Sequence, residues 1–275
     1  MEKTLVYHIY LCEDIDTNVA YKINAECLKY YIENFDKVKY VLVMDNLEDI
    51  DLRNKGIKYV SDLQYKGETS IIFRENTEIG EAATLRDYVV NNKDDINYTF
   101  FCHTKGITYF RGEKLDYKNS IFNWILIMYF YNLNYIKEME DYFFGRISGI
   151  RNFFGTLLMK KNDDDIPLTI PNYHYSGSFY WVNKPSLFKL GDYNYIFSNR
   201  YDAEFYPGYI SGKKNGFSMA SYKDIMLLLN KNNLGCFYSL GDEAYNYIIS
   251  LLGDEEKFYE FKNYIKEQLN GIIDF

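Results

Sequence analysis

The chain has 275 residues, of which 47% are hydrophobic and 25% are charged, and its formal net charge is -8 at neutral pH. This composition is ordinary for a globular protein and excludes a wholly disordered chain, and the length suffices for one large α/β domain. No run of Lys and Arg offsets the negative charge, so nucleic acid is not the expected partner.

The cysteines and the apolar stretches indicate a cytoplasmic protein. Cys12, Cys27, Cys102 and Cys236 show no paired spacing and lie in apolar or helical segments, which predicts free buried thiols in a reducing compartment. The N-terminus has no small-residue cleavage site. The longest apolar stretch, 121–136, is interrupted by asparagines and is too short to cross a hydrocarbon layer of about 30 Å.

The first half of the chain alternates strand-like and helix-like segments. We expect helices at 18–34 and 81–92, and strands at 4–12, 39–44, 58–60, 70–73 and 98–102. Because the strands are almost continuously apolar, they predict a parallel sheet covered on both faces. Ligands bind beyond the carboxyl ends of the strands in such sheets.

The second half begins with a predicted helix at 119–141. A strand-rich region follows at 143–182, interrupted by a polar loop at 161–171, and helices are expected at 242–252 and 254–269. The chain contains neither a Pro-, Gly- or Ser-rich linker nor an internal repeat, so we expect one domain closed by C-terminal helices.

A polar tip follows the predicted strand at 98–102. His103, Thr104 and Lys105 precede Gly106, so they should emerge at the carboxyl edge of the sheet. Lysine is a natural partner for a diphosphate. The alternative is an ordinary strand-to-loop junction with a solvated lysine.

A second polar segment leads into an aromatic strand at 174–181. Gly177 permits close backbone approach to a ligand, and Tyr180 and Trp181 offer flat faces to a sugar ring. The alternative is a strand packed in an aromatic-rich core.

Two carboxylates, Asp202 and Glu204, lie beside Arg200. A carboxylate can act as the general base that takes a proton from an acceptor hydroxyl. The alternative is a surface ion pair between Arg200 and Glu204, which contributes little.

The helix expected to begin at Glu81 is a further candidate. Amides at a helix N-terminus bind anions, and Arg86 could reach a phosphate. Plain helix capping is the alternative.

Metal ligation stays open. His8, His103 and His174 fall on or beside predicted strands and could converge on zinc, although spacing does not show convergence. Asp-x-Asp triplets occur at 14–16, 49–51 and 163–165, but none lies at the tip of a central strand, so we assign a metal to none of them.

Together these segments, in this order, resemble a family of bacterial glycosyltransferase-like proteins found among polysaccharide-synthesis genes. The shared motifs are an N-terminal strand at 6–10, Glu-x-x-Thr-Leu at 81–85, His-Thr-Lys-Gly at 103–106, a Trp followed by a Met at 124 and 128, the segment 174–181 and the segment 200–206. The resemblance covers roughly residues 5 to 210. Ser178 replaces the family's Asn, and Tyr180 and Tyr206 replace its Trp, which puts substrate preference in doubt more than activity.

The resemblance implies an α/β fold of the GT-A type, with a Rossmann-like nucleotide-sugar-binding half, a mostly parallel sheet and C-terminal helices. It implies a GT-A-like catalytic domain at 1–212 and a helical extension at 213–275 packed on the same domain. The expected general base is Glu204 or Asp202. The expected donor-binding residues are Tyr7, His8, Tyr10, Glu81, Thr84, Arg86, His103, Thr104 and Lys105. The expected acceptor- or sugar-binding residues are His174, Tyr175, Ser176, Gly177, Trp181 and Arg200.

The function implied is transfer of a sugar from a nucleotide-sugar, expected to be a UDP-sugar, to a glycan in surface polysaccharide synthesis, with inversion. Some relatives transfer galactofuranose, which places UDP-galactofuranose among the donors. The cofactor is left open between Mn²⁺ or Mg²⁺ and no metal, with Lys105 neutralising the diphosphate. A lipid-linked acceptor would bring the protein to the inner face of the membrane. The alternatives are an inactive nucleotide- or sugar-binding module and a histidine-based zinc hydrolase.

Overall fold

The computed structural model describes residues 2–93, 95–110, 118–144, 152–156, 158–160, 173–175, 177–189, 194–211, 216–218 and 242–272. Within these residues the main sheet has seven strands in the order β3-β2-β1-β4-β8-β5-β9. The strands are β1 (Lys3–Tyr10), β2 (Lys37–Met44), β3 (Glu68–Glu75), β4 (Tyr98–His103), β5 (Phe153–Gly155), β8 (Tyr180–Asn183) and β9 (Gly216–Ser218). A separate pair is formed by β6 (Leu158–Lys160) and β7 (Tyr173–Tyr175).

The first four strands of the sheet run parallel, in the order 3-2-1-4 that Rossmann-type nucleotide-binding halves use. Strand β8 then joins β4 in the antiparallel direction, and β5 is antiparallel to β8 and parallel to β9. The expected α/β class, with a mostly parallel sheet, is confirmed.

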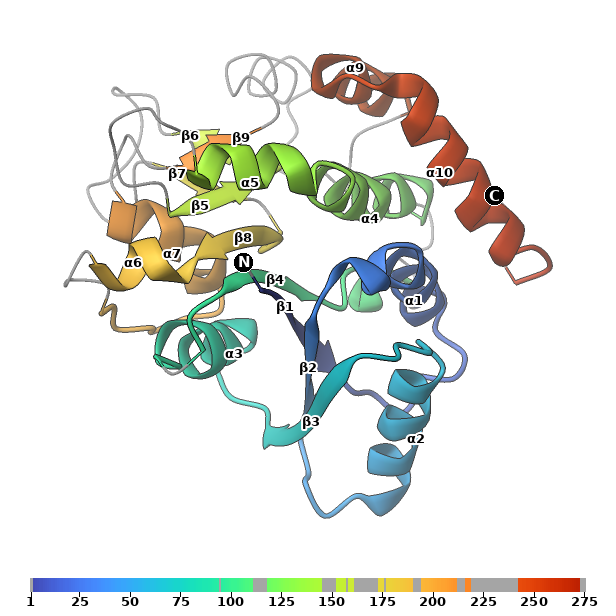
Figure 1. The fold of residues 1–275 in the computed structure, drawn as a ribbon. Coiled ribbons are helices and arrows are strands. Elements are labelled where there is room, and N and C mark those ends of the chain that lie inside the picture. Colours follow the sequence, from blue (N-terminus) through green and yellow to red (C-terminus); the bar gives the residue numbers. More distant parts are fainter. Residues whose placement is uncertain are drawn as a thin grey trace.

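Helices cover both faces of this sheet (Figure 1). They are α1 (Val19–Tyr31), α2 (Ile50–Ser61), α3 (Glu81–Leu85), α4 (Lys118–Leu133), α5 (Ile136–Phe144), α6 (Lys184–Lys189), α7 (Asp202–Ser211), α9 (Asp242–Leu252) and α10 (Glu255–Gln268). Short 3₁₀ turns occupy Ile32–Asn34 and Ile107–Phe110, and a π-helical turn, Arg86–Val90, continues α3.

The alternation of side chains along β1 divides the interior into two cores. Leu5 and Tyr7 face a large core shared with α1, α4 and the C-terminal helices. Val6 faces a smaller core that contains Val89 and Ala203, below α3 and α7. Successive residues of a strand point to opposite faces, so a near-continuous apolar strand is required when both faces are covered.

Helix α4 is buried on all sides, because it lies between α1 and the C-terminal helices. The Tyr131 hydroxyl donates to the Gly253 carbonyl oxygen at 2.8 Å, and the Phe130 ring packs edge-on against Phe258. The expected C-terminal helices are therefore confirmed as a layer over α4. No helix in the described residues is long and apolar enough to span a bilayer.

Three sequence-based predictions of elements are wrong. The strand expected at 58–60 is the last part of α2, which follows the Asp49 N-cap and ends at Ser61, so the apolar Tyr59 and Val60 lie in its final turn. The helix expected at 119–141 ends at Leu133 and restarts at Ile136. The strand expected at 174–181 is broken by Gly177 at φ +92°, so β7 and β8 belong to different sheets. The loop predicted at 161–171 lies outside the described residues.

Candidate functional site

The carboxyl ends of β1 and β4 form the floor of the candidate site. His8 and His103 are register partners, with ring centroids 6.5 Å apart. The loop after β4 is tied to β1, because the Thr104 amide donates to the His8 carbonyl oxygen at 2.9 Å and the Tyr10 amide donates to Thr104 Oγ1 at 3.3 Å. The two strand tips therefore hold one another in place.

Gly177 joins this floor to α7 through both of its backbone groups. Its carbonyl oxygen lies 3.0 Å from His103 Nε2, which therefore carries the ring proton, and its amide donates to Glu204 Oε1 at 2.8 Å. The residue has φ +92°, and a Cβ there would collide with Met128. The positive φ favours glycine at this position, and a Cβ would in addition displace the flexible end of the Met128 side chain.

Lys105 is half-buried in the middle of the site. Its ammonium lies 4.0 Å from the centroid of the Trp124 ring, a cation–π contact from α4. Desolvation lowers the pKa of Lys105, whereas the charges of Glu204 and Glu81 raise it and that of Arg200 lowers it further. The site thus contains a partly dehydrated ammonium facing two carboxylates.

Glu204 projects from the first turn of α7 towards Gly177. Desolvation raises the pKa of its carboxyl group, and Lys105 and the Gly177 amide oppose that rise. Glu81, from the start of α3, also raises the pKa of Glu204. A carboxylate whose pKa is raised is a stronger base than one in water.

The two histidines are neutral at pH 7. Burial lowers the pKa of His8 and of His103 to about 3. His8 Nδ1 is hydrogen-bonded to Thr84 Oγ1 at 2.8 Å, which fixes α3 to β1. Lys105 and Arg200 therefore supply positive charge beside Glu204, and the histidines position neighbouring groups instead of supplying charge.

Acid should destabilise the protein through His8, which is 5% exposed. Its folded pKa is lowered from 6.5 to about 3, so the unfolded chain binds a proton that the folded protein does not. The stabilisation present above pH 6.5 is lost as the pH falls towards 3, by at most about 1.4 kcal/mol per pH unit. Urea unfolding at pH 7 and pH 5 should show that the free energy of unfolding falls less between these pH values in His8→Asn than in the wild type. Equal losses would mean that His8 titrates normally.

The remaining donor-side predictions have mixed outcomes. The Tyr10 hydroxyl reaches the exposed edge and donates to Asp45 Oδ2 at 2.7 Å. Tyr7 is fully buried in the large core, with its hydroxyl 3.1 Å from that of Tyr59, so it does not face the strand tips. Arg86 is turned sideways into an ion pair with Asp87 at 2.6 Å, away from the strand tips.

Two further residues lie in surroundings that differ from those expected: Trp181, an expected sugar-binding residue, and Asp202, one of the two expected general bases. Trp181 is fully buried, stacks on Phe35 at 5.6 Å and donates from Nε1 to the Asn132 carbonyl oxygen, so its face is closed to a sugar. Asp202 is 1% exposed and accepts hydrogen bonds from Ser198 and Asn199, so it shapes the turn before α7. Ser176 and the side chains of His174 and Tyr175 lie outside the described residues.

Asn24 of α1 belongs to the site and was not predicted. Its side-chain amide donates to the Lys105 carbonyl oxygen at 2.8 Å, and its side-chain oxygen accepts from the Lys105 amide at 3.2 Å. Tyr129 also donates to this oxygen, at 3.1 Å. The sequence signal was an asparagine on the apolar face of an amphipathic helix, where a buried amide requires partners.

No three His, Cys, Asp or Glu side chains among the residues that the structure describes are grouped to hold a metal. Asp49, from one of the Asp-x-Asp triplets, instead caps α2 by accepting from the Leu52 amide at 2.9 Å. The triplet at 163–165 lies outside the described residues.

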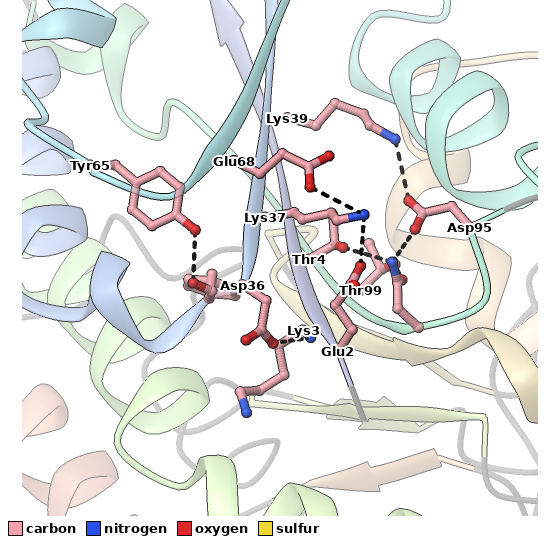
Figure 2. Close-up of polar contacts among 12 residues, drawn as sticks. Glu2, Lys3, Thr4, Asp36, Lys37, Lys39, Tyr65, Glu68, Asp95 and Thr99 are labelled. Atoms are coloured by element: carbon pink, nitrogen blue, oxygen red, sulfur yellow. Dashed lines mark hydrogen bonds and ion pairs between the residues drawn. The ribbon is translucent and has the colours of Figure 1, made fainter.

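The opposite edge of the sheet carries a polar groove of about 270 Å³. Its lysines are paired with carboxylates: Lys37 lies 3.4 Å from Glu68, and Lys39 lies 3.3 Å from Asp95 (Figure 2). These are the amino ends of the parallel strands, whereas ligands of such sheets bind at the carboxyl ends. We therefore place the candidate site at the strand tips that carry His8 and His103.

The chain matches no protein-family model and no curated protein. Among solved structures it is similar to residues 1–349 of S. aureus TarS, a GT-A glycosyltransferase, with a TM-score of 0.35 and 12% identity over 98% of this chain and 74% of that chain. A likeness this distant does not carry an assignment of function, which has to come from the site itself.

Proposed function

We propose that the protein is a glycosyltransferase that moves a sugar from a UDP-sugar to a glycan acceptor with inversion. The observation that supports this most is the meeting of Lys105, Gly177 and Glu204 at the carboxyl ends of β1 and β4. These residues come from three distant motifs, and a nucleotide-binding sheet places ligands at this edge.

Lys105 and Arg200 supply the positive charge of the proposed reaction. A departing nucleoside diphosphate gains negative charge, and fixed cations in a dehydrated site stabilise it strongly. Lys105 is held in position by Asn24 at its backbone and by Trp124 at its ammonium. The proposal assigns diphosphate neutralisation to these cations and requires no metal ion.

Glu204 is the general base in this proposal. It removes the proton from the acceptor hydroxyl as that oxygen attacks the anomeric carbon, while the bond to the diphosphate oxygen breaks on the opposite face. Glu204 is favoured over Asp202 because the Asp202 carboxylate is already occupied by the turn at 198–199.

A thermal-shift experiment tests the donor half of the proposal. UDP should raise the melting temperature of the wild type, by an amount that corresponds to about 2.7 kcal/mol at 100 times the dissociation constant. The shift should be equal with and without manganese and should be lost in Lys105→Met. Lys29→Met on α1, whose ammonium pairs with Glu26, is the matched control and should retain the shift.

Each contrary outcome removes a different part of the proposal. Folded protein that shifts with none of UDP, GDP, CMP, ADP and dTDP would refute a nucleotide-sugar site. A shift that needs manganese would remove the charge role of Lys105. Binding of UDP without any sugar transfer would instead identify an inactive nucleotide-binding module.

A further inference from the structure

Helix α7 carries a second functional face, made of aromatic rings. Tyr201, which immediately precedes the helix, is followed by Phe205 and Tyr209 at four-residue intervals, so the three side chains form one stripe. The ring centroids of Tyr201 and Phe205 are 6.4 Å apart, and those of Phe205 and Tyr209 are 6.5 Å apart. We call these three residues the α7 aromatic stripe.

The stripe reaches the surface, whereas Trp181, Tyr180 and Tyr206 are fully buried. Tyr201 is 57% exposed, Tyr209 is 36% exposed and Phe205 is half-buried. The Tyr195 ring stacks on Tyr209 at 4.6 Å and thereby supports the far end of the stripe.

The stripe begins beside the candidate general base. Glu204 is three residues after Tyr201, which places the two side chains about 60° apart around the helix. Arg200 connects the same two regions, because its guanidinium lies 5.6 Å from the centroid of the Tyr201 ring and its charge acts on Lys105. A molecule lying on the stripe would therefore have one end at Glu204.

The chemistry of the stripe fits a carbohydrate. A sugar ring offers a flat face of C–H groups that packs on an aromatic ring, and tyrosine adds a hydroxyl that hydrogen-bonds to sugar hydroxyls. An anionic bilayer fits poorly, because the chain carries a net charge of -8. Exposed aromatic patches on soluble proteins mark binding surfaces.

We infer that the α7 aromatic stripe binds the acceptor glycan, with the reacting hydroxyl at Glu204 and further sugar units along the stripe from Tyr201 and Phe205 towards Tyr209. This inference rests on the proposed function and adds to it the path of the acceptor and more than one sugar subsite. It also replaces Trp181, whose face is buried, as the source of sugar stacking.

The test uses the full chain, labelled with a fluorophore, on an array of oligosaccharides from bacterial surface polysaccharides. The oligosaccharide that the wild type retains best is then titrated in solution against four variants. We expect Tyr201→Ala and Phe205→Ala each to weaken its affinity about tenfold. Tyr201→Phe, which keeps the ring, should bind within a few-fold of the wild type. Tyr247→Ala, at a 45% exposed tyrosine of α9, should bind as the wild type does.

Unchanged affinity in both alanine variants would overturn the inference, provided that their melting temperatures show them to be folded. Retention of the wild type on no glycan would overturn it as well, as would binding to phosphatidylglycerol vesicles in place of glycans. The UDP thermal shift of the wild type is measured in parallel. A UDP thermal shift without stripe-dependent glycan binding leaves the proposed function standing and removes this inference. Stripe-dependent glycan binding without any UDP thermal shift supports the stripe as a glycan site and removes the donor half of the proposed function.

Discussion

Replacing Glu204 by glutamine is expected to lower the rate of sugar transfer by about 10²- to 10⁴-fold, the usual contribution of a general base. Glutamine keeps the size of the side chain and can still accept the Gly177 amide, but it cannot take a proton. UDP binding should persist in Glu204→Gln, because the cations that face the diphosphate remain. Radiolabelled sugar transfer and a UDP thermal shift on the same preparation measure both quantities.

The matched control is Asp202→Asn, two residues earlier in the same turn of chain. Asp202 accepts hydrogen bonds from the amides of Ser198 and Asn199, so this change should lower the free energy of unfolding by about 1–3 kcal/mol and leave transfer nearly intact. Near wild-type turnover in Glu204→Gln would refute the assignment of the base. A loss of turnover confined to Asp202→Asn would transfer that role to Asp202.

The wild-type rate of transfer should also follow the ionisation of this site. Activity requires Glu204 without its proton and Lys105 with its proton. The pKa of Glu204 is raised from 4.5, so activity should begin at a higher pH than a carboxylate in water would give. The pKa of Lys105 is lowered from 10.5, so activity should end at a lower pH than a lysine in water would give.

Replacing Gly177 by alanine should lower the free energy of unfolding and the rate of transfer together. The left-handed backbone at φ +92° disfavours a Cβ by about 1–2 kcal/mol, and the flexible end of the Met128 side chain has to move aside, which adds a smaller cost. The change should also displace the amide that Glu204 accepts, so transfer should fall together with stability. Urea unfolding gives the first quantity, and the transfer assay gives the second.

Gly253→Ala separates the cost of the positive φ from the cost of the contact with Met128. Gly253 also has a positive φ, +83°, but a Cβ there would meet no atom within 4 Å. Gly253→Ala should therefore lower the free energy of unfolding only by the cost of the left-handed backbone, about 1–2 kcal/mol. Equal losses at the two glycines would show that Met128 moves aside without cost and that space is not what requires glycine at 177.

Much of the fold follows from local pattern. The strands β1, β2 and β4 were predicted within two residues, because strands covered on both faces have to be apolar throughout. The errors occur where a local pattern is ambiguous. The segment Lys58-Tyr59-Val60, with two apolar residues, fits a strand or the last turn of a helix, and in the structure it lies in the last turn of α2.

The sequence by itself determined which chemical groups stand at strand tips and helix starts, because these positions follow from the apolar periods that precede them. It identified Lys105, Gly177 and Glu204 as candidates, but each had an equally simple structural alternative. Only the tertiary structure brought Glu204 to the Gly177 amide and Asp202 into the turn before α7, buried Trp181 while exposing Tyr201, and brought Asn24 to the backbone of Lys105. The physical reason is that burial and hydrogen-bond partners depend on residues far away in the chain, and no local spacing encodes them.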